Sequence, residues 1–245
     1  MANRYWKAFE RTDFFVRAKV GAKRFLGREL RLKPDMSLPC VEVTDWWFAP
    51  RQLAPSPVVY SLGVGRDTVF DEALICDYGA EVYAFDPTPT TREWIDETSL
   101  PERFNFYPWA IADHDGELTF YPRLSRDGEP SWDMMTLMPT AGSEAHGITV
   151  PARTLTSIIK QLGHQHVDLL KMDIEGAEYD VLEQLIESDV RPGQILVEFH
   201  HRFFDDGLAR TSRVIDGLRR IGYGVLAVSI NGREVAFVHK PAVRD

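Results

Sequence analysis

The pattern of apolar and polar positions from residue 58 onward alternates between strands and helices. Short apolar runs predict strands at residues 58–62, 81–85, 104–109, 167–173 and 194–199. Apolar residues three and four positions apart predict the helices between them, at residues 67–77, 89–97, 154–162, 174–187 and 209–221. This alternation is typical of an α/β fold with a doubly wound, mostly parallel sheet.

Two more apolar runs, residues 224–230 and 234–239, follow the last helix and are separated by Asn231-Gly232. Asn-Gly is a strong signal for a two-residue hairpin turn. The sequence therefore predicts a seven-stranded sheet that ends in an antiparallel hairpin.

An insertion interrupts the alternation before the strand at 167–173. Residues 116–121 predict one arm of a ribbon, and residues 147–151 predict a short strand. The polar residues 125–147 predict a loop that lies over the functional site of the domain. We expect this insertion to shape the pocket through Trp132, Met134, Met135 and Met138.

The N-terminal part has a different character. Residues 1–33 hold ten Lys/Arg against three Asp/Glu, interleaved with aromatic residues at roughly helical spacing. Such a segment either packs as a helix with a solvated basic face or docks on an anionic membrane or a partner protein. Proline-rich residues 34–57 form a connector whose Trp46, Trp47 and Phe48 we expect to pack on the domain. The expected division is a basic, aromatic helical segment with its connector at 1–57 and a Rossmann-type domain at 58–245.

Charge and cysteine content narrow the classes of partner and compartment. The chain of 245 residues has a net charge of −9 although its N-terminal segment is basic, so the domain is acidic and a nucleic-acid partner is disfavoured. Cys40 and Cys76 are far apart and lack metal-ligand spacing. The sequence shows neither a long apolar run nor the apolar core of a signal peptide, and we expect a cytoplasmic protein.

The strand at 167–173 breaks into a helix through a run rich in acids. At about 100° per residue, Glu178 falls in the middle of the apolar arc of that helix. A carboxylate there must hydrogen-bond backbone amides and a basic partner, or point into a site. The alternative is that Asp173, Glu175 and Glu178 only favour the positive end of the helix dipole.

The strand at 58–62 leads into a Gly-x-Gly turn and a helix, which favours a nucleotide-like ligand. Gly63 and Gly65 allow a sharp turn and close approach of the backbone to a ligand. Asp86 ends the next strand about 20 residues later, where an acid accepts hydrogen bonds from a ribose. Thr68 replaces the third glycine of the dinucleotide fingerprint. S-adenosylmethionine has no phosphate, so a site that binds it tolerates the loss of the third glycine. It is therefore the preferred ligand.

These features, taken together, resemble the FkbM family of S-adenosylmethionine-dependent methyltransferases over roughly residues 55–240. The block from Lys171 to Glu178 is the most specific part, and the first motif departs from many members by having Ser61 and Asp67. The segments that carry the resemblance are Tyr60-Ser-Leu-Gly-Val-Gly65, Val82-Tyr-Ala-Phe-Asp-Pro87, Trp109-Ala-Ile-Ala-Asp113 with Gly116, Thr154-Leu155, and Asp168-Leu-Leu-Lys-Met-Asp-Ile-Glu-Gly-Ala-Glu178.

The resemblance implies a class I methyltransferase fold and, usually, O-methylation of a small molecule or glycan. It implies that Gly63 and Gly65 line the methionine part of the cofactor and that Asp86 binds its ribose. Ala110 and Asp113 would lie near the adenine, and Asp67 is the candidate for the amino end of the cofactor.

Three residues at the carboxyl ends of predicted strands are candidates for the base that an alcohol acceptor needs: Asp173, Glu198 and His200. Each also has a plainer interpretation. Glu198 would be a buried acid paired with Arg202 or Lys171, and His200 would be a solvated loop residue. A divalent metal on the same three residues is chemically suitable, but the spacing is not diagnostic and we predict no metal.

Three functions follow for testing. The first is a small-molecule or glycan O-methyltransferase. The second is a nicotinamide-dependent oxidoreductase, disfavoured by Thr68 and by the lack of a second catalytic domain. The third is a non-catalytic scaffold that docks through residues 1–33.

Overall fold

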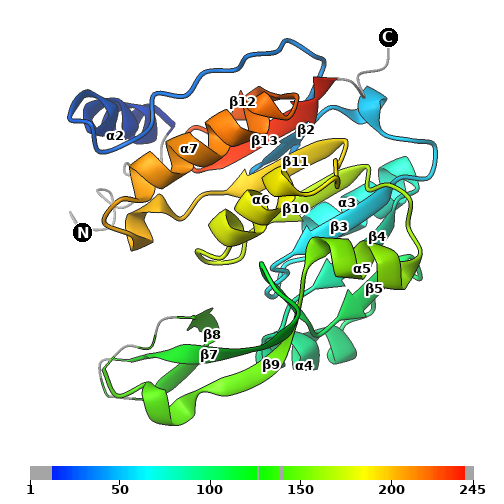
Figure 1. The fold of residues 1–245 in the computed structure, drawn as a ribbon, viewed down its shortest axis with the longest axis vertical. Helices are drawn as coiled ribbons and strands as arrows, with labels where there is room; N and C mark the ends of the chain where they lie inside the picture. The colour runs from blue at the N-terminus through cyan, green and yellow to red at the C-terminus, as the bar shows by residue number, and fades with distance from the viewer. Residues whose placement is uncertain (1–12, 126, 128, 138, 140, 241–245) are drawn as a thin grey trace, which may run out of the picture.

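The computed structural model describes residues 13–125, 127, 129–137, 139 and 141–240. Its centre is a seven-stranded sheet (Figure 1). In spatial order the strands are β12 (Tyr223–Val228), β13 (Glu234–His239), β11 (Gln194–Glu198), β10 (Leu169–Met172), β3 (Val58–Leu62), β4 (Glu81–Phe85) and β5 (Phe104–Tyr107). β13 runs antiparallel to both of its neighbours, whereas β11, β10, β3, β4 and β5 are mutually parallel. The α/β fold predicted from the sequence is confirmed.

Three helices cover one face of the sheet. They are α5 (Leu155–Leu162), α6 (Glu178–Glu187) and α7 (Gly207–Arg220). Their apolar sides form one core with alternate strand residues such as Tyr60 and Leu62, both fully buried. A strand buried on both faces explains why the strand segments are apolar runs instead of alternating patterns.

The other face is covered partly by a helix and partly by the connector. α3 (Val69–Tyr78) packs there beside the hairpin of β1 (Val41–Val43) and β2 (Trp46–Phe48). Trp46 and Phe48 share a core with Val59 and Val82, so the connector aromatics pack on the domain as predicted. α4 (Pro89–Glu97) follows β4, and α2 (Asp13–Phe25) lies near the edge of the sheet formed by β12 (Figure 1).

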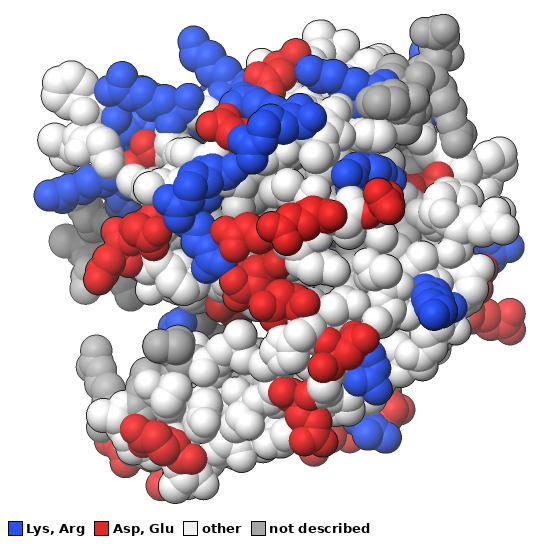
Figure 2. Space-filling view, in the orientation of Figure 1, with Lys and Arg blue, Asp and Glu red and all other residues white. Residues whose placement is uncertain are grey.

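The insertion forms a second sheet that projects from the main body. Its order is β6 (Ala110–Ile111), β9 (Ile148–Arg153), β7 (Gly116–Leu124) and β8 (Pro130–Thr136). Figure 2 shows the molecule hollowed between this sheet and the main body, with Asp and Glu side chains beside the hollow.

Two sequence predictions are corrected here. Residues 125–147 are not simply a loop, because they contain β8 and a 3-10 helix at Glu144–His146. β8 has little apolar alternation, and its pairing with β7 stabilises it as a strand. The last hairpin is not a two-residue turn at Asn231-Gly232. Gly232 N donates to Ser229 O at 3.1 Å, so Ile230 and Asn231 are the central residues.

Other boundaries differ by less. The helix after β10 begins at Glu178, not at residue 174, because Glu175 and Gly176 adopt positive φ angles of 51° and 107° in an intervening turn. Cys40 and Cys76 are both free thiols. Within the described part of the chain, helices fall short of the length and hydrophobicity needed to span a bilayer.

Candidate functional site

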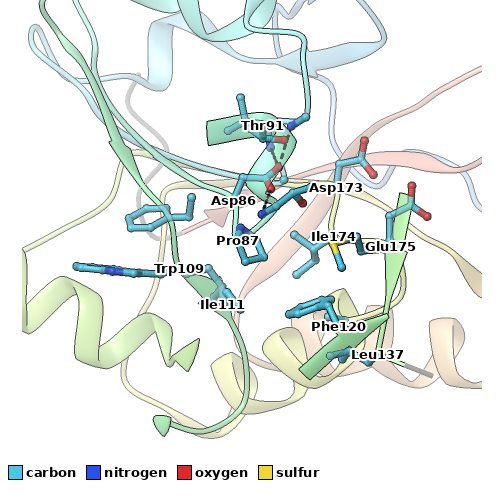
Figure 3. A pocket seen from close by; sticks show the side chains of 18 of the residues that line it. Asp86, Pro87, Thr91, Trp109, Ile111, Phe120, Leu137, Asp173, Ile174 and Glu175 are labelled. Atoms are coloured by element: carbon cyan, nitrogen blue, oxygen red, sulfur yellow. Dashed lines mark hydrogen bonds between the residues drawn. The ribbon is translucent and has the colours of Figure 1, made fainter. Parts of the chain in front are cut away.

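A cavity lies at the carboxyl ends of β3, β4 and β10, where ligands bind in open α/β sheets. Its floor comes from the main sheet and one wall from the projecting sheet (Figure 3). The lining residues are Gly63, Val64, Gly65, Phe85, Asp86, Pro87, Thr88, Thr91, Trp109, Ala110, Ile111, Phe120, Met135, Thr136, Leu137, Asp173, Ile174, Glu175 and Ala177.

The two glycines of the turn after β3 serve different purposes. A Cβ atom at Gly63 would lie 1.7 Å from the carbonyl oxygen of Asp173, so this position requires glycine for the close approach of two strand ends. A Cβ atom at Gly65 would have no protein atom within 4 Å. Both have positive φ angles, 77° and 57°. Gly65 therefore leaves open space beside a backbone that lines the cavity.

Asp86 fastens the glycine turn to the end of β4. Its Oδ2 accepts hydrogen bonds from the amides of Val64 at 3.1 Å and Gly65 at 2.9 Å, and its Oδ1 accepts one from Thr88 at 2.8 Å. A carboxylate offers about four acceptor positions, so one remains on Oδ1. The side chain can thus shape the turn and still bind a donor in the cavity.

The lysine within the apolar strand β10 lies beneath the same turn. Lys171 is buried, its Nζ donates to Gly63 O at 3.4 Å, and it lies 5.0 Å from the centroid of the Trp46 ring. A buried ammonium needs such partners to offset its lost hydration. These contacts assign this lysine to support of the turn.

Aromatic and aliphatic side chains make the opposite wall. Phe85, Tyr107 and Trp109 form a ladder with ring centroids 4.8 to 6.2 Å apart, and Ile111 lies beside Trp109 in the cavity (Figure 3). Phe120 and residues 135–137 face them from β7, β8 and the residue after β8. An apolar slot with a few polar groups at one end is suited to a flat heteroaromatic ring.

Four carboxylates surround His200 next to the cavity. His200 Nε2 lies 3.7 Å from Asp173 Oδ1 and 3.8 Å from both Glu175 Oε2 and Glu198 Oε1, while Nδ1 lies 3.4 Å from Glu178 Oε1. These residues come from the ends of β10 and β11, the turn between β10 and α6, and the start of α6. Parallel strands ending at one edge of the sheet bring them together.

Burial and charge shift two pKa values in this cluster. Burial alone would lower the pKa of His200, but the carboxylates of Glu178, Glu175 and Glu198 outweigh it and raise the pKa to about 9. Burial raises the pKa of Glu198 to about 7, with Asp173 adding to the shift and Arg233 opposing it. His200 is therefore protonated at neutral pH in the unliganded protein, which removes it as a ready proton acceptor.

Glu178 is a structural carboxylate. It is fully buried, and it accepts hydrogen bonds from Gly176 N at 2.8 Å and His200 N at 2.7 Å. Of the two interpretations of its position on the apolar arc, the structure confirms bonding to backbone amides. Glu178 thereby links the turn before α6 to the segment that carries His200.

The partner predicted for Glu198 was wrong. Arg233 Nη1 lies 2.5 Å from Glu198 Oε1, whereas Arg202 pairs with Glu29 at 2.6 Å. Arg233 comes from the hairpin between β12 and β13, and it reaches Glu198 because β13 inserts beside β11. Sequence spacing carries no sign of that insertion.

The cavity gathers some of the predicted site residues and not others. Gly63, Gly65, Asp86, Ala110 and Asp173 line it, and Glu198 and His200 lie directly behind Asp173. The other two predicted positions, Asp67 and Asp113, are exposed and outside the lining, where Asp67 accepts from Val69 N and Asp113 contacts His114.

Sequence reasoning missed several lining residues. Trp109 ends a predicted strand and Ile111 follows it, which is a usable signal, but Thr91 lies in a predicted helix and Phe120 and Leu137 come from the insertion. Of the insertion residues expected to shape the pocket, Met135 lines it and Met138 lies outside the described residues.

Comparisons with known proteins agree with this geometry. Residues 57–225 match the Methyltransferase FkbM domain. Over 147 residues the chain is 33% identical to probable methyltransferase-like protein 24 of Homo sapiens, covering 58% of this chain and 32% of that one. It is 23% identical over 172 residues to 2-O-methyltransferase NoeI of Sinorhizobium fredii (strain NBRC 101917 / NGR234), covering 66% and 71%.

The chain thus spans about a third of the length of its human relative. Among solved structures, the FkbM methyltransferase of Methylobacillus flagellatus KT aligns with a TM-score of 0.46 and 12% identity, covering 75% of this chain and 44% of that one. Because the family match covers more than half of the sequence and includes the residues that build the cavity, the chain belongs to the FkbM methyltransferase domain family.

Proposed function

We propose that this protein is an S-adenosylmethionine-dependent methyltransferase that methylates a hydroxyl group of a small molecule or glycan. The observation that carries the proposal is one cavity bordered by the glycine turn, Asp86 and Asp173. The family assignment favours a methyltransferase over a nicotinamide-dependent enzyme. The similarity to a relative named 2-O-methyltransferase supports oxygen as the acceptor atom.

The residues present fit the cofactor. The free acceptor position on Asp86 Oδ1 suits a ribose hydroxyl, the open space at Gly65 admits a ligand against the backbone, and the slot beside Trp109 suits an adenine. When bound, the cofactor supplies a methyl group that its sulfonium already activates.

The protein then contributes alignment and proton removal. Asp173 lines the cavity and is 35% exposed, so it is placed to take the proton of the acceptor hydroxyl as the new oxygen–carbon bond forms and the sulfur–carbon bond breaks. Protonated His200 and the pair of Glu198 with Arg233 lie behind it and hold its surroundings fixed.

Calorimetric titration with S-adenosylmethionine and S-adenosylhomocysteine tests the cofactor. Asp86→Asn keeps one acceptor oxygen for the amides of Val64 and Gly65, but its NH2 group can accept neither from Thr88 N nor from the ribose, so we expect affinity to fall about 10- to 100-fold. Asp77→Asn, which changes an exposed acid of α3 outside the cavity lining, is the matched control and should leave affinity unchanged. Folded wild-type protein that binds neither compound would overturn the proposal.

Methyl transfer is tested next with a panel of sugars and small alcohols. Asp173→Asn should retain cofactor binding and lose turnover by about 10²- to 10⁴-fold, the usual contribution of a base. Equal turnover in wild type and Asp173→Asn would remove Asp173 from this role.

Docking to an anionic lipid surface through the basic N-terminal segment is a second candidate activity, compatible with a scaffold role. Phe25 and Leu26, at the end of α2, are 82% and 62% exposed, and the exposed cations Arg17, Lys19 and Arg28 lie nearby in sequence. Figure 2 shows Lys and Arg gathered over α2 and α7. Apolar tips among cations favour anionic lipid headgroups.

Co-sedimentation with phosphatidylserine and phosphatidylcholine vesicles tests this candidate. We expect binding to the anionic vesicles only, lost in a Phe25→Ala, Leu26→Ala double variant and retained in Val69→Ala, another exposed apolar position. Equal recovery with both vesicle types, or no more recovery with vesicles than without them, would exclude a surface selective for anionic lipid.

A further inference from the structure

The cluster around His200 contains more negative charge than its neighbours offset. Asp173, Glu175, Glu178 and Glu198 all have a carboxylate oxygen within 3.8 Å of the imidazole. Among the described residues, the cations that contact them are His200 itself and Arg233, which binds Glu198. Four carboxyl groups therefore face two cations at most, and negative charge is left beside the cavity.

His200 is an independent indication that something binds there. Its side chain is 7% exposed, and Nδ1 makes no hydrogen bond of normal geometry. Nε2 points at Asp173, Glu175 and Glu198 from 3.7 to 3.8 Å, beyond hydrogen-bond distance of each. Nε2 thus faces three carboxylates from a buried ring without a hydrogen bond to any of them, and coordination of a metal by Nε2 would use this position.

Glu178 completes the arrangement from the other side of the ring. It faces Nδ1 at 3.4 Å and is itself held by the amides of Gly176 and His200. Histidines that bind metals commonly present their second nitrogen to a fixed carboxylate, which orients the ring and raises its basicity. Binding requires the neutral imidazole, and a bound cation displaces the proton.

The turn before α6 directs the remaining ligands to one place. Ligand atoms of Asp173, Glu175 and His200 lie within 4.8 Å of one another. Figure 3 shows the carboxylates of Asp173 and Glu175 pointing to the same side, away from Trp109. Glu175 holds a φ of 51°, which costs a residue other than glycine about 1–2 kcal/mol.

We propose that Asp173, Glu175 and His200, with Glu198 beside them, bind a divalent cation of the Mg²⁺ or Mn²⁺ class at the edge of the cavity. Carboxylate oxygens with a single imidazole suit these ions. Resting on the proposed methyl transfer, the inference also gives the cation a role: it binds the acceptor hydroxyl, lowers its pKa and so eases loss of its proton.

Titration of chelator-treated protein with Mn²⁺, followed by the electron paramagnetic resonance signal of the free ion, tests the site. We expect one Mn²⁺ per chain, competed by Mg²⁺, with affinity at least about tenfold weaker in Glu175→Gln and Asp173→Asn. Both residues are partly exposed, so these variants should fold, which circular dichroism checks. Glu183→Gln, an acid of α6 paired with Arg210, is the control and should bind as wild type does.

Wild-type affinity retained in an Asp173→Asn, Glu175→Gln double variant, or no Mn²⁺ binding at all, would overturn the site. Binding of S-adenosylhomocysteine is measured on the same samples. Protein that binds S-adenosylhomocysteine but not Mn²⁺ would refute only the cation site. Protein that binds Mn²⁺ but not S-adenosylhomocysteine would refute only the proposed function. Methyl transfer that resists EDTA would overturn the role given to the cation.

Discussion

Gly63 and Asp173 approach so closely that the ends of β3 and β10 leave no room for a side chain between them. A Cβ atom at Gly63 would lie 1.7 Å from Asp173 O and 2.7 Å from Asp173 C. Asp173 N donates to Leu62 O at 2.9 Å, which fixes the same contact from the strand side. The glycine of the turn after β3 therefore sets the position of the residue proposed to take the proton.

Gly63→Ala should destabilise the protein by about 2–4 kcal/mol, because it combines a left-handed φ with a clash against backbone atoms. Gly65→Ala should cost only about 1–2 kcal/mol, since its Cβ meets no protein atom, but it fills the space offered to the ligand. Urea unfolding and calorimetric titration measure the two effects. Equal losses of stability in the two variants would contradict this division of roles.

Glu178→Gln should lower the free energy of unfolding by about 1–3 kcal/mol, because the amide presents an N–H group to one of the two backbone amides that Glu178 now accepts from. Glu183→Gln on the same helix changes only a partly exposed pair with Arg210 and should stay within about 1 kcal/mol of wild type. Denaturant unfolding at neutral pH compares them, and matching midpoints would refute the structural role of Glu178.

The pairing of buried Glu29 with His201 and Arg202 predicts a pH dependence of stability. Burial alone would raise the pKa of Glu29, but the two basic neighbours hold it at about 2. Because the pKa of Glu29 in the folded protein lies below its ordinary value of 4.5, the pairing stabilises the fold fully above about pH 4.5. This contribution, up to about 3 kcal/mol, is lost as the pH falls toward 2.

Glu29→Gln should therefore be less stable than wild type at pH 7 and should lose less stability between pH 4.5 and pH 2.5. Thermal unfolding across this range measures the difference, with the exposed acid Glu42→Gln as the control. Parallel curves for wild type and Glu29→Gln would contradict the assignment.

Trp109 should report ligand binding by fluorescence. Its ring lies in the cavity wall and stacks near Tyr107, with centroids 4.8 Å apart. Bound S-adenosylhomocysteine should quench this indole, and Trp109→Phe should abolish the quench while keeping an aromatic wall. Trp47→Phe removes a half-buried tryptophan of β2, outside the cavity, and should leave the quench in place. An unchanged quench in Trp109→Phe would exclude an adenine at this wall.

Much of the fold and part of the site were predictable from local pattern. The bounds of β3, β4, α4 and β13 match the prediction residue for residue, because each is a short segment bounded by proline, glycine or polar residues. Thr154 caps α5, accepting from Ser157 N at 3.1 Å. Gly63, Asp86 and Asp173 meet at one cavity because the carboxyl ends of parallel strands share an edge of the sheet.

By itself, then, the sequence determined most elements of the main sheet, the class of sheet and the edge at which the cavity lies, since apolar period and turn residues act over a few positions. Only the tertiary structure decided which side chains far apart in the chain become partners. Arg233 reaches Glu198 through the insertion of β13, Glu29 reaches His201, and β8 forms on β7 without a strand pattern of its own. Such pairings depend on how whole elements pack, and that information is spread over the entire chain.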